Sequence, residues 1–343
     1  MFKQRRTILA GLAALIAAPL LAAAPTQAAD IKTIGIDWAY YNPVSLVLKD
    51  KGWLEQEFAK DGIAIRWVFS AGSNKALEFL NARGIEFGST AGAAVLLARV
   101  NGAPLKAVYV YSKPEWTALV TRPESGITKV EDLKGKRIAV TRGTDPYIFL
   151  LRALAAHKLS EKDVKIILLQ HADGRTALEK GDVDAWAGLD PMMAQTELER
   201  GSKLFFRDAN ANTYGTLNIR EDFAAEHPDL VVRVLKVYER ARLYALDNPK
   251  ELQKTLADAA KLSDTVAAKQ LERTDLRYSA IGAPQKATIL AAGKALQDSG
   301  VIPADKDVAK LVDELIDTRF SQQLGLRAAQ AGDVKDAAKS VSR

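Results

Sequence analysis

The sequence has no cysteine among its 343 residues. Disulfide bonds are therefore excluded, and a small disulfide-stapled scaffold with them. The lipid-bearing cysteine of a bacterial lipoprotein is excluded for the same reason. If the chain is exported, it is therefore expected to be free in solution rather than held to a membrane by a lipid.

Histidine is also scarce, and the motifs of the common hydrolases and nucleotide-binding enzymes are missing. His157 is expected on a helix and His227 in an exposed turn, so the histidines do not predict a shared metal site. There is no G-x-S-x-G elbow, no H-E-x-x-H helix and no phosphate-binding G-x-x-x-x-G-K-[ST] loop. The sequence therefore predicts neither catalytic residues nor a metal or cofactor. His171 follows a predicted strand, where a ligand contact and a structural role both stay open.

Neither sign of charge is in large excess. The formal net charge of +6 falls to +3 when Lys3, Arg5 and Arg6 are removed with the N-terminal segment described next. The remaining acidic and basic residues are interleaved along the chain, whereas nucleic-acid recognition calls for a basic patch. Nucleic acid is therefore not expected as a partner.

Only the N-terminus has a long apolar run. The basic "MFKQRR" precedes "ILAGLAALIAAPLLAAA", and the small residues of "PTQAAD" follow. This is the three-part pattern of a secretory signal, with cleavage expected after Ala28 or, as the near alternative, Ala29. No later run approaches the roughly 20 apolar residues of a membrane span. We expect residues 1–28 to be a signal peptide and the mature protein to be periplasmic.

Two segments of the mature chain resemble each other. Strand-like "TIGIDWAYYNP" and "RIAVTRGTDP" each open a series of short apolar runs that alternate with segments of helical periodicity. The triplet Ala-Leu-Glu recurs at 76–78 and 177–179, an offset of 101 residues. The repeated order predicts two β-α-β-α-β lobes, each with a mainly parallel sheet flanked by helices.

The part after Tyr214 reads as a series of helices that end at Pro, Gly or Ser, with a last helix at about 308–316. These helices are expected to complete the first lobe. The predicted organisation is therefore lobe 1 over 29–122 plus 214–325, lobe 2 over 123–213, and a frayed polar tail over 326–343.

Ligands of open α/β sheets lie beyond the carboxyl ends of the strands, so the loops at these ends are the candidate site. Many of these loops contain Gly, Ser or Thr and lead directly into a helix, and aromatic residues lie beside them. The candidate ligand contacts are Trp38, Tyr41, Asn42, Ser70, Gly72, Ser89, Thr90, Ala91, Trp116, Arg142, Gly143, Thr144, Asp145, His171, Asp190 and Tyr214.

The first N–H groups of a helix have no internal partner and lie at the positive end of its dipole, so such loops suit an anion. "FGSTAGAAV" and "RGTDP" are predicted to face each other as two jaws of an anion clamp. Ser, Thr and Gly are also ordinary helix caps, and this second interpretation stays open for any single loop. Trp186, inside a predicted strand, is expected to be core instead.

Three stretches, "FGSTAGAA", "DLKGKRIAVTRGTDPYIFLLRAL" and "DVDAWAGLDP", resemble the aliphatic sulfonate-binding proteins. These belong to the nitrate/sulfonate/taurine group of periplasmic binding proteins for ABC importers. The resemblance covers about 31–320. It implies two α/β lobes joined by two hinge crossings and closing over the ligand, a type II-like arrangement.

Several motif positions match that family. Ser89, Thr90 and Ala91 stand where it has "FG-x-T-G", and residues 142–145 stand where it has "KGSN". Asp190 and Pro191 match its "W-D-P", with leucine in place of the tryptophan. "TAGAA" departs from the family's "TGEAP" and "DWAYYN" from its "YQK", so the organic part of the substrate is left open.

The resemblance implies a periplasmic receptor that binds an aliphatic sulfonate and delivers it to an inner-membrane ABC permease, as a monomer and not as an enzyme. A larger alkyl or an aromatic sulfonate would also fit the departures from the family motifs. Nitrate, taurine or a thiamine-precursor pyrimidine are alternative ligands of the same fold. An exported enzyme that uses His171 or an aspartate is a further alternative.

Overall fold

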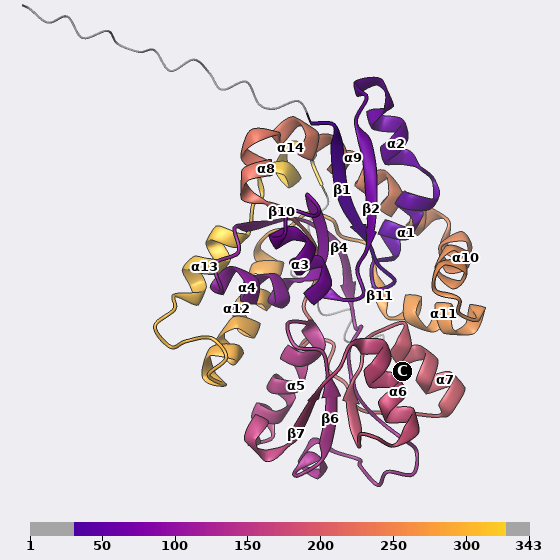
Figure 1. Cartoon of the computed structure of the whole chain (residues 1–343), viewed down its shortest axis with the longest axis vertical. Coiled ribbons are helices and arrows are strands. Elements are labelled where there is room, and N and C mark those ends of the chain that lie inside the picture. Colours follow the sequence, from indigo (N-terminus) through magenta and orange to yellow (C-terminus); the bar gives the residue numbers. More distant parts are fainter. Residues whose placement is uncertain (1–30, 327–343) are drawn as a thin grey trace, which may run out of the picture. The chain divides into compact units, whose positions relative to one another are not determined.

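The computed structural model describes residues 31–326 and contains two β-sheets surrounded by helices (Figure 1). The predicted signal peptide and the tail beyond residue 326 lie outside the described residues. None of the helices in residues 31–326 combines the length and apolar character that a membrane span requires.

One sheet has six strands in the order β11-β4-β10-β3-β1-β2, and the other has five in the order β7-β6-β8-β5-β9. The strands are β1 (Thr33–Trp38), β2 (Ala64–Phe69), β3 (Phe87–Ala91), β4 (Leu105–Pro114), β5 (Leu119–Thr121), β6 (Arg137–Val140), β7 (Lys165–Leu168), β8 (Ala185–Ala187), β9 (Lys203–Phe206), β10 (Gly215–Arg220) and β11 (Thr274–Asp275).

The predicted repeat is present as three parallel strands in each sheet. Strand β1 lies between β2 and β3 and is parallel to both, and β6 is likewise parallel to β7 and β8. The other strands join antiparallel, β10 beside β3 and β5 beside β8, so each sheet as a whole is mixed. This arrangement confirms the predicted α/β fold, because connections through helices put strands of the same direction side by side.

The helices are α1 (Pro43–Asp50), α2 (Trp53–Phe58), α3 (Ser73–Asn81), α4 (Gly92–Val100), α5 (Asp145–Ala156), α6 (His171–Lys180), α7 (Met192–Arg200), α8 (Glu221–Glu226), α9 (Pro228–Asp247), α10 (Pro249–Ala260), α11 (Asp264–Glu272), α12 (Ala283–Asp298), α13 (Val308–Leu315) and α14 (Arg319–Gln323). Short 3₁₀ turns are η1 (Ala59–Asp61), η2 (Val130–Leu133) and η3 (Glu161–Asp163). Helices α1, α9 and α10 all begin with proline, which is preorganised for the first turn of a helix.

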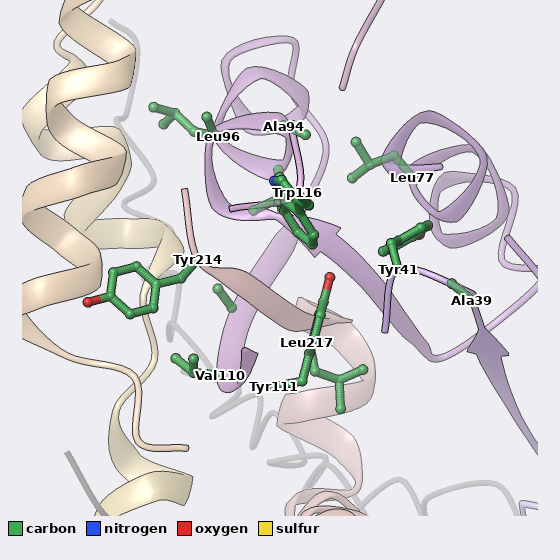
Figure 2. Close-up of a cluster of buried hydrophobic side chains, with 14 of the residues drawn as sticks. Ala39, Tyr41, Leu77, Ala94, Leu96, Val110, Tyr111, Trp116, Tyr214 and Leu217 are labelled. Atoms are coloured by element: carbon green, nitrogen blue, oxygen red, sulfur yellow. The ribbon is translucent and has the colours of Figure 1, made fainter. Parts of the chain in front are cut away.

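The hydrophobic core follows the strands and continues into the segments between the sheets. Figure 2 shows Tyr41, Tyr111 and Trp116 within this core, where the rings of Tyr41 and Trp116 lie 5.9 Å apart and edge to face. Trp186 of β8 is fully buried, as expected of a core residue. His227, expected in an exposed turn, is instead buried where α8 meets α9, because its ring packs on Phe223.

The chain passes between the two sheets twice, from β4 to β5 and from β9 to β10. The C-terminal helices then return to the six-stranded sheet, where β11 pairs with the end of β4. Helix α11 also packs against α7 beside the five-stranded sheet. The carboxyl ends of β1 and β2 in one sheet therefore come close to those of β7 and β8 in the other.

Candidate functional site

A cavity of about 250 Å³ lies between loops that follow the parallel strands of the two sheets. Its lining residues are Tyr40, Tyr41, Phe69, Ser70, Ala71, Gln170, His171, Ala172, Arg175, Asp190, Pro191, Met192, Gln195, Ala260 and Leu262. Four of the predicted contacts are among them: Tyr41, Ser70, His171 and Asp190. The rule that ligands of open α/β sheets bind beyond the carboxyl ends of the strands therefore identifies this cavity as the candidate site.

The six-stranded sheet contributes an aromatic wall to the cavity. Strands β1 and β2 are parallel and in register, so their last residues, Trp38 and Phe69, lie side by side. The ring of Phe69 is 4.8 Å from the ring of Trp38 and 4.8 Å from that of Tyr40. We call these three residues the aromatic cluster. Phe69 stays 38% exposed although it is a large apolar residue.

The five-stranded sheet contributes the N-terminus of α6. The side chain of its N-cap residue, Gln170, makes no capping hydrogen bond, so the first N–H groups of the helix have no partner from their own cap. Arg175 follows His171 by one helical turn, and both line the cavity. The guanidinium donates to Gln195 and lies 3.6 Å from Glu179. A positive helix end and a cation thus face the same space.

His171 is the most unusual polar group of the cavity. Its side chain is almost wholly buried, with the residue 1% exposed, and neither ring nitrogen has a hydrogen-bond partner. Burial lowers the pKa of His171 to about 3, so the ring is neutral. A Cβ atom on Gly72 would lie 2.9 Å from its Nε2 atom. The imidazole of one lobe therefore contacts the strand-end loop of the other.

Behind the aromatic wall, Asp37 organises the ends of β1 and β3. It accepts hydrogen bonds from the Ser89 amide and hydroxyl, both at 2.8 Å. Asn42 donates to the Ser89 hydroxyl at 2.7 Å and to Tyr238 at 2.6 Å. Burial raises the pKa of Asp37 to about 6, although the hydroxyls of Ser89 and Ser70 oppose the shift. Ser89 and Asn42 therefore belong to an internal network.

The segment "FGSTAG" lies elsewhere than expected. Ser89, Thr90 and Ala91 belong to strand β3 rather than to a loop, because β10 pairs with this whole stretch. The hydroxyl of Thr90 donates to the carbonyl of Ala91 at 3.0 Å and accepts from Asn218 at 2.8 Å. The amide of Ala91 donates to Ser73 at 3.0 Å. None of these three residues lines the cavity.

"RGTDP" is not brought to the cavity either. The guanidinium of Arg142 lies over the ring of Tyr147 at 5.4 Å and 3.8 Å from Glu161, with 59% of its side chain exposed. Thr144 is the N-cap of α5, and its hydroxyl donates to the Thr141 carbonyl at 2.6 Å. Gly143 lines a different hollow, beside α3 and α4. The two predicted jaws nevertheless lie close together outside the cavity, because the Thr213 hydroxyl accepts from the Ala93 amide at 3.2 Å and donates to Asp145 at 2.8 Å.

Asp145 and Trp116 meet at the crossings between the sheets. The buried Asp145 carboxylate accepts from the Trp116 indole at 2.8 Å and from the Thr213 amide and hydroxyl at 2.9 and 2.8 Å. Burial raises the pKa of Asp145. The neighbouring residue, Tyr214, is buried beside the ammonium of Lys113. The contacts of Asp145 therefore tie α5 to both crossings. Trp116, Asp145 and Tyr214 were all predicted as ligand contacts, but none of them lines the cavity.

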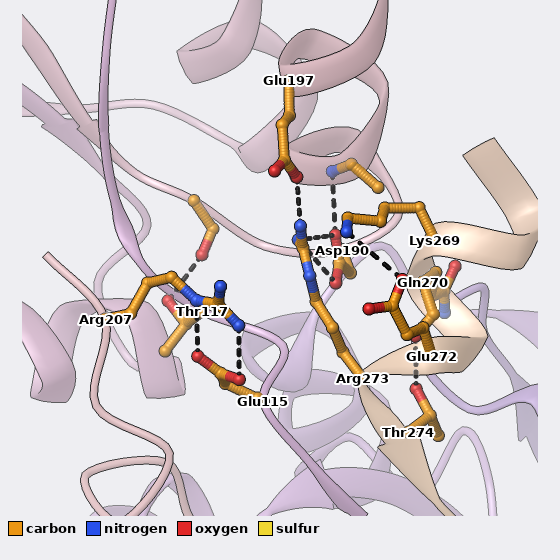
Figure 3. A network of polar contacts seen from close by, with 12 residues as sticks. Glu115, Thr117, Asp190, Glu197, Arg207, Lys269, Gln270, Glu272, Arg273 and Thr274 are labelled. Carbon is orange, nitrogen blue, oxygen red and sulfur yellow. Dashed lines mark hydrogen bonds and ion pairs between the residues drawn. The ribbon is translucent and has the colours of Figure 1, made fainter. Parts of the chain in front are cut away.

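Asp190 connects the cavity to an ionic network (Figure 3). Its oxygens lie 3.5 Å from Arg273, which also binds Glu197, and one oxygen accepts from the Ala194 amide at 2.9 Å. Burial raises the pKa of Asp190 to about 6, against the opposing effect of Arg273. Arg273 precedes β11 of the six-stranded sheet, whereas Asp190 follows β8 of the five-stranded sheet. The network therefore spans both lobes.

The sequence interpretation missed several lining residues, among them Tyr40, Phe69 and Arg175. Phe69 is the last residue of a strand whose following loop was selected, and Arg175 follows a selected histidine by one helical turn. The sequence pattern could therefore have identified both positions. It could not have identified Ala260 and Leu262, because they come from the end of α10, distant in sequence from the strand ends. Within residues 31–326, no group of three or more His, Asp or Glu side chains is placed to hold a metal ion.

A family model described as NMT1/THI5 like matches residues 44–252. A putative aliphatic sulfonates-binding protein of Bacillus subtilis is 31% identical over 233 residues, which are 67% of this chain and 70% of that protein. A second, from Escherichia coli, is 29% identical over 240 residues, 69% of this chain and 74% of that protein. Among solved structures, the alkanesulfonate-binding protein SsuA of Xanthomonas axonopodis pv. citri, bound to MOPS, is 26% identical; it has a TM-score of 0.75 and covers 83% of this chain and 98% of that chain.

These similarities confirm the resemblance seen in the sequence and the two-lobed α/β fold. The relatives are named as binding proteins and not as enzymes, which agrees with the expectation for this chain. The chain is therefore a periplasmic binding protein of the ABC-importer type.

Proposed function

The chain belongs to the NMT1/THI5-like family, and on that premise we propose that it binds an organosulfonate in the cavity between its lobes. It would carry this ligand through the periplasm to an ABC permease of the inner membrane, working as a monomer. The predicted lobes, 29–122 plus 214–325 and 123–213, would close over the ligand by a hinge motion at the two crossings.

The observation that carries the proposal is the composition of the cavity. One side offers an uncapped helix N-terminus with Arg175, which suits an anionic group. The other side offers Tyr40 and Phe69, which suit an apolar group. A charge-assisted hydrogen bond contributes about 1.5–3 kcal/mol and micromolar affinity requires about 8 kcal/mol, so a few such bonds with apolar contact suffice. An organic molecule with a sulfonate at one end combines both requirements.

The buried Asp37 carboxyl further favours an orientation in which the anionic group of the ligand lies away from the six-stranded sheet. It is buried behind the aromatic wall, at the ends of β1 and β3, where its negative form would repel a nearby anion. The carboxylate of Asp190, in contrast, is offset by Arg273. We therefore place the sulfonate at the N-terminus of α6 and the organic group toward the six-stranded sheet.

The test is calorimetric titration of the purified mature protein with ethanesulfonate, nitrate, sulfate and a thiamine-precursor pyrimidine. Ethanesulfonate is expected to bind most tightly of the four. Arg175→Gln should weaken its affinity roughly 10- to 100-fold, the ratio given by the loss of one charge-assisted bond. Arg142→Gln is the matched control, because it removes a guanidinium from the exposed surface instead.

Tighter binding of nitrate or of the pyrimidine than of ethanesulfonate would reject the sulfonate assignment. An equal loss of affinity in Arg142→Gln would instead indicate that the anion binds at the "RGTDP" loop, as the sequence predicted. Thermal unfolding of both variants shows whether each retains its fold.

A further inference from the structure

The volume and the lining residues of the cavity indicate which organic group the ligand has, and this inference rests on the proposed function. Its volume of about 250 Å³ is below the roughly 300–1,000 Å³ of drug-sized ligand pockets. At about 30 Å³ per water molecule, this is the volume of about eight waters. A cavity of this size suits a sulfonate with a single small organic group rather than a long chain or several rings.

The aromatic cluster is built to accept another flat ring. Trp38 and Tyr40 both pack against Phe69, with interplanar angles of 50° and 49°. Phe69 and Tyr40 line the cavity, and Phe69 keeps 38% of its surface exposed. Aromatic pairs gain about 0.5–1.5 kcal/mol beyond their buried area, because the ring edges and faces carry opposite partial charges. A saturated ring of equal size would not gain this contribution.

The cavity lining offers an ammonium group on the ligand no carboxylate that lacks a partner. Asp190 is the one carboxylate among the lining residues, and its oxygens already face Arg273 and the Ala194 amide. Arg175, which also lines the cavity, would repel a cation. A buried ammonium without a carboxylate partner is costly. Zwitterionic sulfonates such as taurine are therefore expected to bind more weakly than sulfonates with an uncharged organic group.

His171 supplies the second, independent sign of a ligand. It is 1% exposed, lines the cavity, and neither of its ring nitrogens has a partner within the protein. Native structures rarely leave both nitrogens of a buried imidazole unsatisfied. A neutral imidazole offers one donor and one acceptor, so its N–H group can bond a sulfonate oxygen beside the α6 N-terminus.

We propose that the cavity selects an arylsulfonate with an uncharged ring. The ring packs against Phe69 and Tyr40, while the sulfonate faces His171, Arg175 and the N-terminus of α6. A cavity of this kind binds an aromatic ring more tightly than an open chain, whereas a cavity for short alkanesulfonates would not.

The experiment compares benzenesulfonate with cyclohexanesulfonate, which has a ring of the same size without π-electrons, and adds ethanesulfonate and taurine. Benzenesulfonate is expected to bind about fivefold more tightly than cyclohexanesulfonate, the ratio that about 1 kcal/mol of aromatic pairing gives. Taurine is expected to bind most weakly. Phe69→Leu should bring the ratio of the two ring ligands close to one. Leu168→Ala is the control, because Leu168 is exposed at the end of β7 and does not line the cavity.

A ratio of one in the unaltered protein, or taurine binding as tightly as ethanesulfonate, would overturn this inference while the proposed function stands. Absence of binding by all four sulfonates would overturn both. A ratio that survives Phe69→Leu would show that the preference does not come from the aromatic cluster and would reject the assignment.

Discussion

At the scale of single residues, the carboxyl group of Asp37 shows how much of the strand-end chemistry is internal. It is fully buried and accepts hydrogen bonds from the backbone and hydroxyl of Ser89. Burial raises its pKa from 3.8 to about 6. The folded protein therefore favours the protonated form, and ionisation costs free energy of folding.

Asp37→Asn should stabilise the protein above pH 6. The raised pKa means that the stabilising effect of protonation is fully present below about pH 4 and is lost as the pH rises through 6. Because the amide stays neutral and its oxygen can still accept from Ser89, we expect a gain of up to roughly 3 kcal/mol at pH 8. Urea unfolding of both proteins at pH 5 and pH 8 measures it. A difference that does not grow between these pH values would contradict the buried, ionising carboxyl.

At the scale of elements, α5 is fastened to both crossings through its first residue. The Asp145 carboxylate accepts from Trp116, which follows β4, and from Thr213, which precedes β10. Arg152, further along the same helix, donates to the Ala211 carbonyl at 2.8 Å. The helix therefore holds together the two segments that a hinge would use.

Asp145→Ala should lower the free energy of unfolding by about 2–4 kcal/mol, because it leaves the buried donors of Trp116 and Thr213 without their acceptor. Asp229→Ala is the matched control. Asp229 also stands in the first turn of a helix, α9, but it is exposed, so its loss should cost less than about 1 kcal/mol. Urea unfolding measures both. Equal effects in the two variants would show that Asp145 acts only on the helix dipole.

The sequence predicted the elements better than the directions of their side chains. The repeated β-α-β-α-β order and the strand-end rule were enough to select Ser70 and His171, because both depend on local periodicity. The position of Thr90 depended on β10, which pairs with β3 from 126 residues away and extends that strand through the predicted loop. Arg273 enters the network at Asp190 from a part of the chain that no local pattern connects to it. Long-range pairing therefore decided which loops form the cavity.

At the scale of the whole molecule, Gly72 lies where the two lobes approach each other closely. The backbone of Gly72 is extended, with φ at 162°, so any residue could adopt it. A Cβ atom there would lie 2.9 Å from His171 on the other lobe and 2.8 Å from the Asn74 side chain, which can rotate away. Alanine at this position should therefore disturb closure without disturbing lobe 1.

Gly72→Ala is expected to weaken ethanesulfonate binding roughly 10-fold, because overpacking of a closed contact costs about 1–3 kcal/mol. The free energy of unfolding should change little. Gly282→Ala is the control, since its backbone is also extended and a Cβ atom there meets nothing within 4 Å.

Small-angle scattering with saturating ethanesulfonate should show a larger radius of gyration for Gly72→Ala than for the control. The double variant Gly72→Ala/His171→Ser, which removes the imidazole, should return to the compact form. If it stays expanded, the contact between Gly72 and His171 does not limit closure.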